Sequence, residues 1–228
     1  NVPFSPGMSR VDSQQIQPLS IRLLYNPERR ASLFTVPGLL GVILTMTMIM
    51  FTSIAIVRER ERGNIELLIT TPVRNLELML GKIIPYVGIG LIQVSVILAL
   101  SVILFEVPVA GKLLHVYGAC LVFILANLTL GLMISTIVSN QLAAMQMSFF
   151  ILLPSILLSG FMFPFVAMPK AAQHLAEILP LTHFLRIIRG VVLRGESLWR
   201  LYPEMVFLLL FALFFLVISS IRFTKRLD

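Results

Sequence analysis

Charge is scarce in this chain. Asp, Glu, Lys and Arg make up 13% of its 228 residues, whereas 57% are hydrophobic. A soluble domain usually carries about 25% charged residues. Four long stretches contain no charge at all, and they are residues 31–57, 83–105, 113–169 and 205–221. Since a membrane-spanning helix needs about 20 largely apolar residues, this composition excludes a soluble enzyme, a nucleic-acid-binding domain and a disordered chain. It indicates an integral membrane protein.

Cysteine is almost absent as well. Cys120 is the only one, so no disulfide can form within the chain, and the redox compartment stays open. The net charge of +7 favours loops that contact anionic lipid headgroups, because the apolar content excludes nucleic acid as a partner. The chain begins with Asn1 rather than Met and opens with no signal peptide, so we expect a fragment of a longer protein.

Five membrane-spanning helices are predicted from the apolar runs, which makes the fold an all-α membrane protein. Residues 113–169 are too long for one helix, and the polar Ser-Asn-Gln sequence at 139–141 divides them. Pro37 suits the first turn of the first span, and Pro154 is expected to kink the fourth. The predicted spans cover residues 36–57, 83–105, 116–138, 142–163 and 201–221.

Residues 1–30 differ from the rest because they are polar and rich in proline. A weak alternation of apolar residues predicts a strand, which we interpret as the tail of an extracytoplasmic domain. A disordered leader is an alternative that the pattern leaves open. The remaining residues, 31–228, are predicted to form the membrane domain. Charge alone does not decide which of its loops face the cytoplasm. Placing the loop 58–82 and the C-terminus in the cytoplasm puts eight of the 18 Lys and Arg residues there, although the density of charge in that loop favours this assignment.

The loop between the first two predicted spans carries both signs of charge. Arg58 and Glu61 are opposite charges at helical spacing, which predicts that the first helix extends into water with this pair on its surface. A glycine follows, and a Thr-Pro pair then suits the first turn of a further short helix. The residues that define this amphipathic element are Arg58, Glu59, Arg60, Glu61, Gly63, Glu66, Leu67, Leu68, Thr71, Pro72, Glu77 and Lys82.

Two roles are open for this amphipathic element. A helix that rests on lipid is the commoner role of such a segment. The interleaving of both signs of charge favours instead a docking element for a soluble partner, because a lipid-binding helix more often has a basic face.

A second polar element is predicted at residues 164–200, as a helical hairpin that lies in, or dips into, the outer leaflet. Prolines break it into helices that are too short to span a bilayer. Its arginines are expected to snorkel to the membrane surface, and contact with lipid phosphates or an anionic substrate is the alternative. The residues that define this outer hairpin are Gly160, Pro164, Pro169, Pro180, Arg186 and Arg189.

Residues for catalysis are hard to find. His174, Glu177 and His183 are candidates for a metal site, because the first two have helical spacing, but a third ligand is uncertain. The chain contains no Gly-x-x-x-x-Gly-Lys-Ser/Thr loop, so we do not expect it to bind ATP in that way. The centres of the predicted spans also lack the charged residues that ion-coupled transporters use. Energy for any pumping should therefore come from elsewhere.

The charged loop resembles a known family. The run from Arg58 to Pro72, with Glu77 and Gly81-Lys82, resembles the permease signature of type-two ATP-binding-cassette exporters. Asn64 stands where that family often has a hydroxyl residue. The resemblance covers roughly residues 20–225 and includes Tyr25-Asn26-Pro27, Val36-Pro37-Gly38, Ser159-Gly160-Phe161, Phe163-Pro164 and Leu179-Pro180-Leu181-Thr182.

This resemblance implies a six-helix permease with both termini in the cytoplasm. The first helix and most of a large extracytoplasmic domain would precede Asn1. A coupling helix, which maps onto residues 65–80, would seat in a groove of a separate cytoplasmic ATPase. That ATPase would bind ATP and Mg²⁺, so this chain would bind no cofactor. Further implied partners are a second permease copy or paralogue, membrane lipids and, in some systems, a periplasmic adaptor.

The sequence thus predicts the membrane subunit of an ATP-driven exporter in the bacterial inner (plasma) membrane, with its C-terminus in the cytoplasm. The substrate would be hydrophobic or amphipathic, such as a drug, a lipid or a glycolipid. The chain would be no enzyme by itself. An ATP-independent channel or scaffold is the alternative, and a lipid-modifying enzyme that uses His174, Glu177 and His183 is the third hypothesis.

Overall fold

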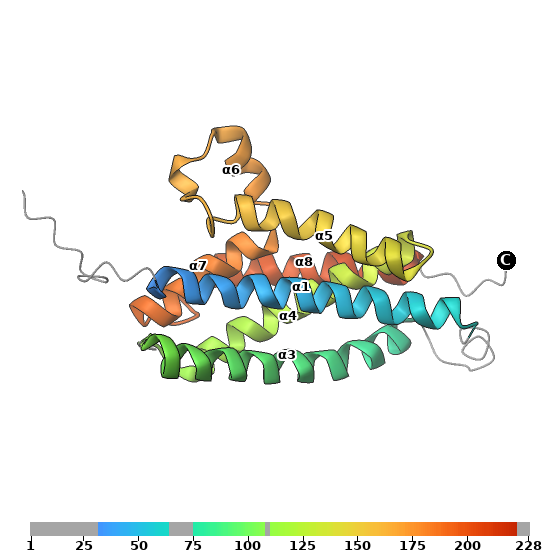
Figure 1. The fold of residues 1–228 in the computed structure, drawn as a ribbon, viewed down its shortest axis with the longest axis horizontal. Helices are drawn as coiled ribbons and strands as arrows, with labels where there is room; N and C mark the ends of the chain where they lie inside the picture. Colours follow the sequence, from blue (N-terminus) through green and yellow to red (C-terminus); the bar gives the residue numbers. More distant parts are fainter. Residues whose placement is uncertain (1–31, 64–74, 108–109, 223–228) are drawn as a thin grey trace, which may run out of the picture.

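The computed structural model describes residues 32–63, 75–107 and 110–222, and all regular structure within them is helical. Five of the described helices are long and apolar enough to cross a membrane (Figure 1). They are α1 (Ser32–Glu61), α3 (Asn75–Phe105), α4 (Leu113–Ile137), α5 (Gln141–Leu158) and α8 (Tyr202–Arg222). The predicted all-α membrane fold is therefore confirmed. The strand predicted in residues 1–30 lies outside the described residues.

The first two helices begin earlier than the sequence predicts. Because α1 begins at Ser32 and α3 at Asn75, Pro37 and Pro85 lie inside helices. Pro37 was expected in a first turn, and that expectation was wrong. Proline inside a helix removes one main-chain hydrogen bond, which packed membrane helices tolerate because neighbouring groups satisfy the freed carbonyl. The apolar pattern marks only the membrane-embedded part of such a helix.

The connection between α4 and α5 lies at the polar sequence that divides the long apolar run. The side-chain oxygen of Asn140 accepts a hydrogen bond from the main-chain nitrogen of Ala143 at 2.8 Å, and this cap starts α5. At its other end, α5 stops at Leu158 rather than at residue 163. Gly160 follows with φ of 84°, a conformation that favours glycine and turns the chain out of the helix.

The helices α1 and α4 form the centre of the bundle. In the most apolar 18-residue part of each helix, 61% of α1 and 67% of α4 is buried, compared with 17–22% of α3, α5 and α8. Gly131 allows the two central helices to approach closely, because a Cβ atom there would lie 2.8 Å from the main-chain oxygen of Ile49. Small residues at such crossings are the usual basis of helix packing in membranes, where water exclusion contributes little.

The chain between α5 and α8 forms the short helices η1 (Phe165–Ala167) and α6 (Lys170–Ala176) and the longer helix α7 (Pro180–Arg194). Figure 1 shows α6 projecting from the bundle, whereas α7 lies at its end. Most of α7 is buried against α1, α4 and α8, and Phe184 stacks on Phe123 at 4.0 Å between ring centres. We refer to this end of the bundle as the α7 end, and to the opposite end, where α1 ends, as the Arg58 end.

Candidate functional site

The structure describes only some of the residues that are predicted to couple to an ATPase. The end of α1 and the side chain of Lys82 in α3 are described. The middle of the predicted element is not. Outside the described residues lie Glu66, Leu67, Leu68, Thr71 and Pro72, together with the side chain of Glu77.

Arg60 links the end of α1 to the end of α4. Its two terminal nitrogens donate hydrogen bonds to the main-chain oxygens of Ser135, at 2.8 Å, and Val138, at 3.1 Å. The last carbonyls of a helix have no partner within the helix, and they carry the negative end of the helix dipole. A guanidinium is therefore a favourable partner at this position, and α1 caps α4.

Glu61 makes the complementary contact at the start of α5. Its carboxylate accepts a hydrogen bond from the main-chain nitrogen of Gln141 at 3.0 Å and another from the Gln141 side-chain amide. Arg58 donates to the side-chain oxygen of Gln141 at 3.1 Å. Carboxylates favour helix N-termini for the same electrostatic reason. One turn of α1 thus contacts both sides of the α4–α5 connection.

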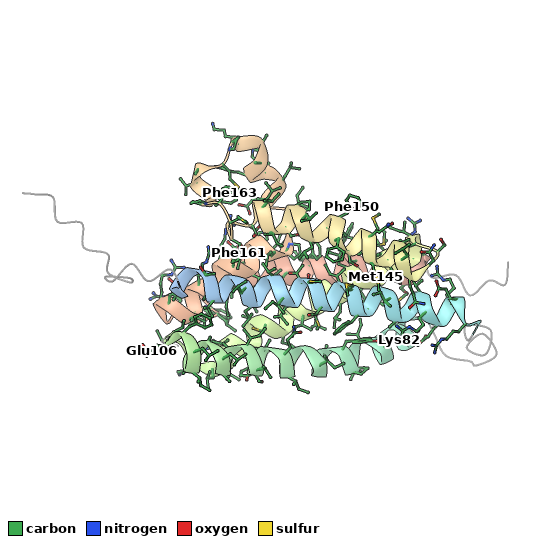
Figure 2. All side chains as sticks on the ribbon, viewed as in Figure 1. Lys82, Glu106, Met145, Phe150, Phe161 and Phe163 are labelled. Atoms are coloured by element: carbon green, nitrogen blue, oxygen red, sulfur yellow. The ribbon has the colours of Figure 1, made fainter. Side chains whose placement is uncertain are left out.

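A weaker contact ties α1 to α3. Lys82 forms an ion pair with Glu59, and both side chains are partly exposed. Figure 2 shows Lys82 at this end of the bundle. Exposed pairs of this kind contribute roughly 0.2–1 kcal/mol. The contact therefore orients the two helices without fixing them.

The pairing expected within α1 is not the one that forms. The helix does extend to Glu61, but Arg58 and Glu61 both bond to Gln141, and Glu59 bonds to Lys82. These partners lie on other helices, so spacing along α1 could not reveal them. The polar sequence 139–141 predicted a break between helices. Its polarity was the only indication that Gln141 would contact α1.

A cavity of about 270 Å³ opens beside this junction. Met50, Phe51 and Ile54 of α1 and Met145 of α5 supply apolar walls, and Arg58 lies at its edge. Met145 is labelled in Figure 2. Flexible methionine side chains adapt to ligands of different shape, so the lining suits an apolar or amphipathic molecule.

A second group of charged residues lies at the α7 end. Arg186 of α7 binds both carboxylate oxygens of Glu177 and lies 3.3 Å from Glu204 in the first turn of α8. The bond to Arg186 holds the pKa of Glu177 below its ordinary value, and Glu177 in turn raises the pKa of Arg186. This cluster joins the end of α6 to α7 and α8.

His183 completes the cluster from inside the bundle. Only 8% of its side chain is exposed, and its ring stacks on Phe207 at 3.7 Å between ring centres. Its Nε2 lies 2.8 Å from the main-chain oxygen of Glu177, and its Nδ1 contacts the Glu204 carboxylate. A carbonyl oxygen only accepts, so Nε2 carries a proton.

The candidate metal ligands are not assembled into a metal site. The Glu177 carboxylate lies 3.7 Å from His183 Nε2 but is paired with Arg186. Among the described residues, no group of three His, Cys, Asp or Glu side chains could hold a metal ion. The third residue in contact with His183 and Glu177 was expected to be His174, but the cluster contains Glu204, which the sequence analysis missed. The only clue to Glu204 in the sequence was its position as the acidic residue in the first turn of α8.

The prolines of the predicted outer hairpin mark the starts of helices. Pro164 precedes η1, Pro169 precedes α6, and Pro180 is the first residue of α7. Proline fits these positions because the main-chain nitrogen there has no partner within the helix. Arg189 of α7 donates a hydrogen bond to the main-chain oxygen of Gly160 at 3.2 Å. The loop that follows α5 is thus held to α7.

The fold defines a multi-pass helical membrane protein whose charged contacts gather at the two ends of the bundle. Residues 7–221 match the family described as ABC-2 family transporter protein, so the chain belongs to that family.

The curated relatives are transport permeases and larger transporters. The chain is 33% identical over 221 residues to the "probable multidrug ABC transporter permease YbhS" of Escherichia coli (strain K12), covering 95% of this chain and 59% of the relative. It is 33% identical over 192 residues to the permease YbhR of the same strain, covering 82% and 52%. With "ABC transporter G family member 20" of Dictyostelium discoideum it shares 26% identity over 207 residues, covering 89% and 28%. No solved structure matches the chain. The chain thus spans little more than half the length of the first two relatives.

Proposed function

We propose that this chain forms most of the membrane domain of an exporter permease that is driven by a separate cytoplasmic ATPase. Membership of the ABC-2 family and the permease names of its relatives support the class. In this proposal the ATPase binds ATP and Mg²⁺, and two permeases, identical or paralogous, work together in the bacterial inner membrane. The Arg58 end and the C-terminus face the cytoplasm.

The observation that carries the mechanical part of the proposal is the contact of Arg60 and Glu61 with the α4–α5 connection. In our proposal the coupling segment, residues 65–80, docks on the ATPase. A displacement of that segment pulls on the end of α1. Because Arg60 holds the end of α4 and Glu61 the start of α5, these two helices follow α1.

The substrate class follows from the lining of the membrane domain. The cavity beside Met50, Phe51 and Met145 is apolar apart from its edge. A hydrophobic or amphipathic molecule such as a drug or a lipid fits this chemistry, whereas a small ion would lose its hydration without replacement ligands. Movement of α1 and α5 together relative to α3, which contributes Tyr86 to the lining, would change the shape of this cavity.

Co-purification tests the docking step. The full-length permease is expressed with its candidate ATPase, and the double variant Glu66→Ala and Leu68→Ala is compared with wild type and with Ser139→Ala. We expect the double variant to lose the ATPase while remaining folded. The control should retain it, because Ser139 lies on the same end of the bundle but in a different connection. Retention of a functional ATPase by the double variant would refute the docking assignment.

Transport assays separate the exporter from a passive channel. Proteoliposomes that contain the permease with its ATPase should export a fluorescent hydrophobic dye only when ATP is supplied. Equal flux without ATP would contradict the proposal and support a channel.

A further inference from the structure

A pair of polar side chains joins α1 and α3 in the middle of the membrane-spanning region. The Thr47 hydroxyl donates a hydrogen bond of 2.9 Å to the side-chain oxygen of Gln93. Thr47 lies near the middle of the span Thr35–Glu61, and Gln93 near the middle of the span Gly81–Phe105. Both side chains are half-buried. Water is absent at this depth of a bilayer, so a polar group there needs a partner from the protein or from a bound molecule.

The bond to Thr47 satisfies only one half of the Gln93 amide. A carboxamide has an acceptor oxygen and a nitrogen with two N–H donors. The nitrogen of Gln93 has no acceptor among the residues that the structure describes, and it is not enclosed in the bundle. Polar pairs hold membrane helices together, which accounts for the oxygen of Gln93 but not for its nitrogen. An amide donor without an acceptor is costly in hydrocarbon.

This pair continues two walls of the apolar cavity at the Arg58 end. On α1, Thr47 precedes the cavity residue Met50 by three positions, and on α3, Gln93 follows the cavity residue Tyr86 by seven. Residues at these spacings share a helix face. Three positions correspond to about 4.5 Å along a helix, so a drug-sized molecule in the cavity reaches the pair. Gln93 lies beyond the cavity on the side toward the middle of the membrane.

We propose that Gln93 binds the substrate of this exporter by donating a hydrogen bond to a carbonyl oxygen on an otherwise apolar molecule. The apolar part of that molecule lies against Met50 and Phe51 in the cavity. The ester oxygens of the surrounding lipids lie near the membrane surface, outside the hydrocarbon core, so they do not satisfy this donor. The inference rests on the proposed function and adds a chemical requirement for the substrate.

Binding of 9-fluorenone and of fluorene to the purified full-length permease tests this requirement. The two probes share one ring skeleton, and only 9-fluorenone has a carbonyl oxygen. Their tritiated forms are measured by scintillation proximity in a neutral detergent, with a correction for partition into protein-free micelles. We expect wild type to bind 9-fluorenone about fivefold more tightly, because one hydrogen bond is gained. Equal corrected affinities would overturn the proposal, and this comparison requires no variant to fold.

Gln93→Leu removes the donor and keeps a side chain of similar size. The affinity for 9-fluorenone should fall about fivefold, to that for fluorene, while the affinity for fluorene stays the same. A preference for 9-fluorenone that persists in Gln93→Leu would contradict the proposal.

Thr47→Val is the matched control, because it removes the same contact between α1 and α3 but leaves the Gln93 nitrogen in place. It should lower the melting temperature about as much as Gln93→Leu and still prefer 9-fluorenone. Loss of the preference in both variants would mean that the pair only packs α1 against α3, which would refute the substrate contact.

The binding assay contains neither ATPase nor ATP, so its outcome is separate from that of the dye-export assay. Dye flux without ATP in proteoliposomes would refute the exporter. Absence of a preference for 9-fluorenone would refute only the role of Gln93.

Discussion

The two ends of the bundle use charged side chains differently. At the Arg58 end, Arg60 and Glu61 bond to main-chain groups where α4 ends and α5 begins, and Glu61 stays exposed. At the α7 end, the charged side chains bond to one another around His183, which is buried. The first arrangement links helices through their termini, and the second links them through a side-chain cluster.

This difference has a mechanical consequence. Contacts of exposed charges contribute about 0.2–1 kcal/mol each, so they can break and form again as helices move. The Arg186–Glu177 pair at the α7 end is also partly exposed, and the stronger contact there is that of Glu204, 22% exposed, with the buried His183. Breaking a fully buried pair costs about 3–5 kcal/mol, because the remaining group is left without a partner. The Arg58 end is therefore suited to movement, and the α7 end to holding α6, α7 and α8 together.

Removal of Glu204 should have the largest effect on stability. Glu204→Ala leaves both His183 and Arg186 without one of their acceptors in a largely buried place. We expect a loss of about 2–3 kcal/mol, below the full value for a buried pair because the Glu204 side chain is 22% exposed. Thermal unfolding of the full-length permease in detergent measures it.

The matched control for this variant is Glu196→Ala. Glu196 pairs with Arg194 at 3.3 Å, and the Arg194 side chain is 45% exposed. A loss below about 1 kcal/mol is expected. Equal losses in the two variants would mean that the α7 cluster is no stronger than a surface pair.

Acid should weaken the α7 end. Arg186 holds the pKa of Glu177 below its ordinary value, so this carboxylate stabilises the fold fully above that ordinary value, about 4.3. The contribution is lost as the pH falls further, through the lowered pKa. Glu177→Gln should therefore give a melting temperature that declines less steeply below this pH. An unchanged slope would contradict the assignment.

Removal of Arg60 should affect coupling more than stability. Arg60→Gln loses the charge at the α4 terminus, and we expect about 1 kcal/mol of destabilisation. ATP hydrolysis by the bound ATPase should continue, but transport per ATP should fall several-fold. Proteoliposomes that report both quantities measure this ratio.

Arg62→Gln is the control for this substitution. It removes the same charge from the same end of the bundle, and the Arg62 side chain is exposed. Its transport per ATP should match wild type. A similar loss in both variants would indicate a general effect of charge rather than a contact with α4.

The smallest effect is expected from the pair of Glu59 and Lys82. Either Glu59→Lys or Lys82→Glu alone should cost below about 1 kcal/mol, and the double charge exchange should recover most of it. Double-mutant cycles of melting temperature measure the coupling. A strong coupling energy between Glu59 and Lys82 would mean that α1 and α3 move as one body. We do not expect this from a partly exposed pair.

The sequence predicted the helices better than their ends. Apolar runs and the Ser-Asn-Gln break locate all five spans, because lipid requires about 20 apolar residues in each. It placed Pro37 in a first turn and extended the fourth span to residue 163, whereas α1 begins at Ser32 and α5 ends at Leu158. Helix ends depend on caps and on tertiary contacts, which local composition does not contain.

Contacts between distant segments could not be predicted from the sequence. Glu61 and Gln141 are 80 positions apart, and His183 and Glu204 are 21 apart. The pattern within α1 suggested a pair between Arg58 and Glu61, since only neighbours on one helix can be read from spacing. In the structure, Arg58 and Glu61 instead contact Gln141 at the start of α5.

The distance between Arg62 and Ser139 tests the central claim most directly. Spin labels are attached at Arg62→Cys and Ser139→Cys, with Cys120 replaced by Ala, in the full-length permease bound to its ATPase. If α1 carries the α4–α5 connection with it, this distance stays constant between the ATP-free and ATP-bound states. It should change by several ångströms when Arg60→Gln is added. An equal change without that substitution would contradict the account.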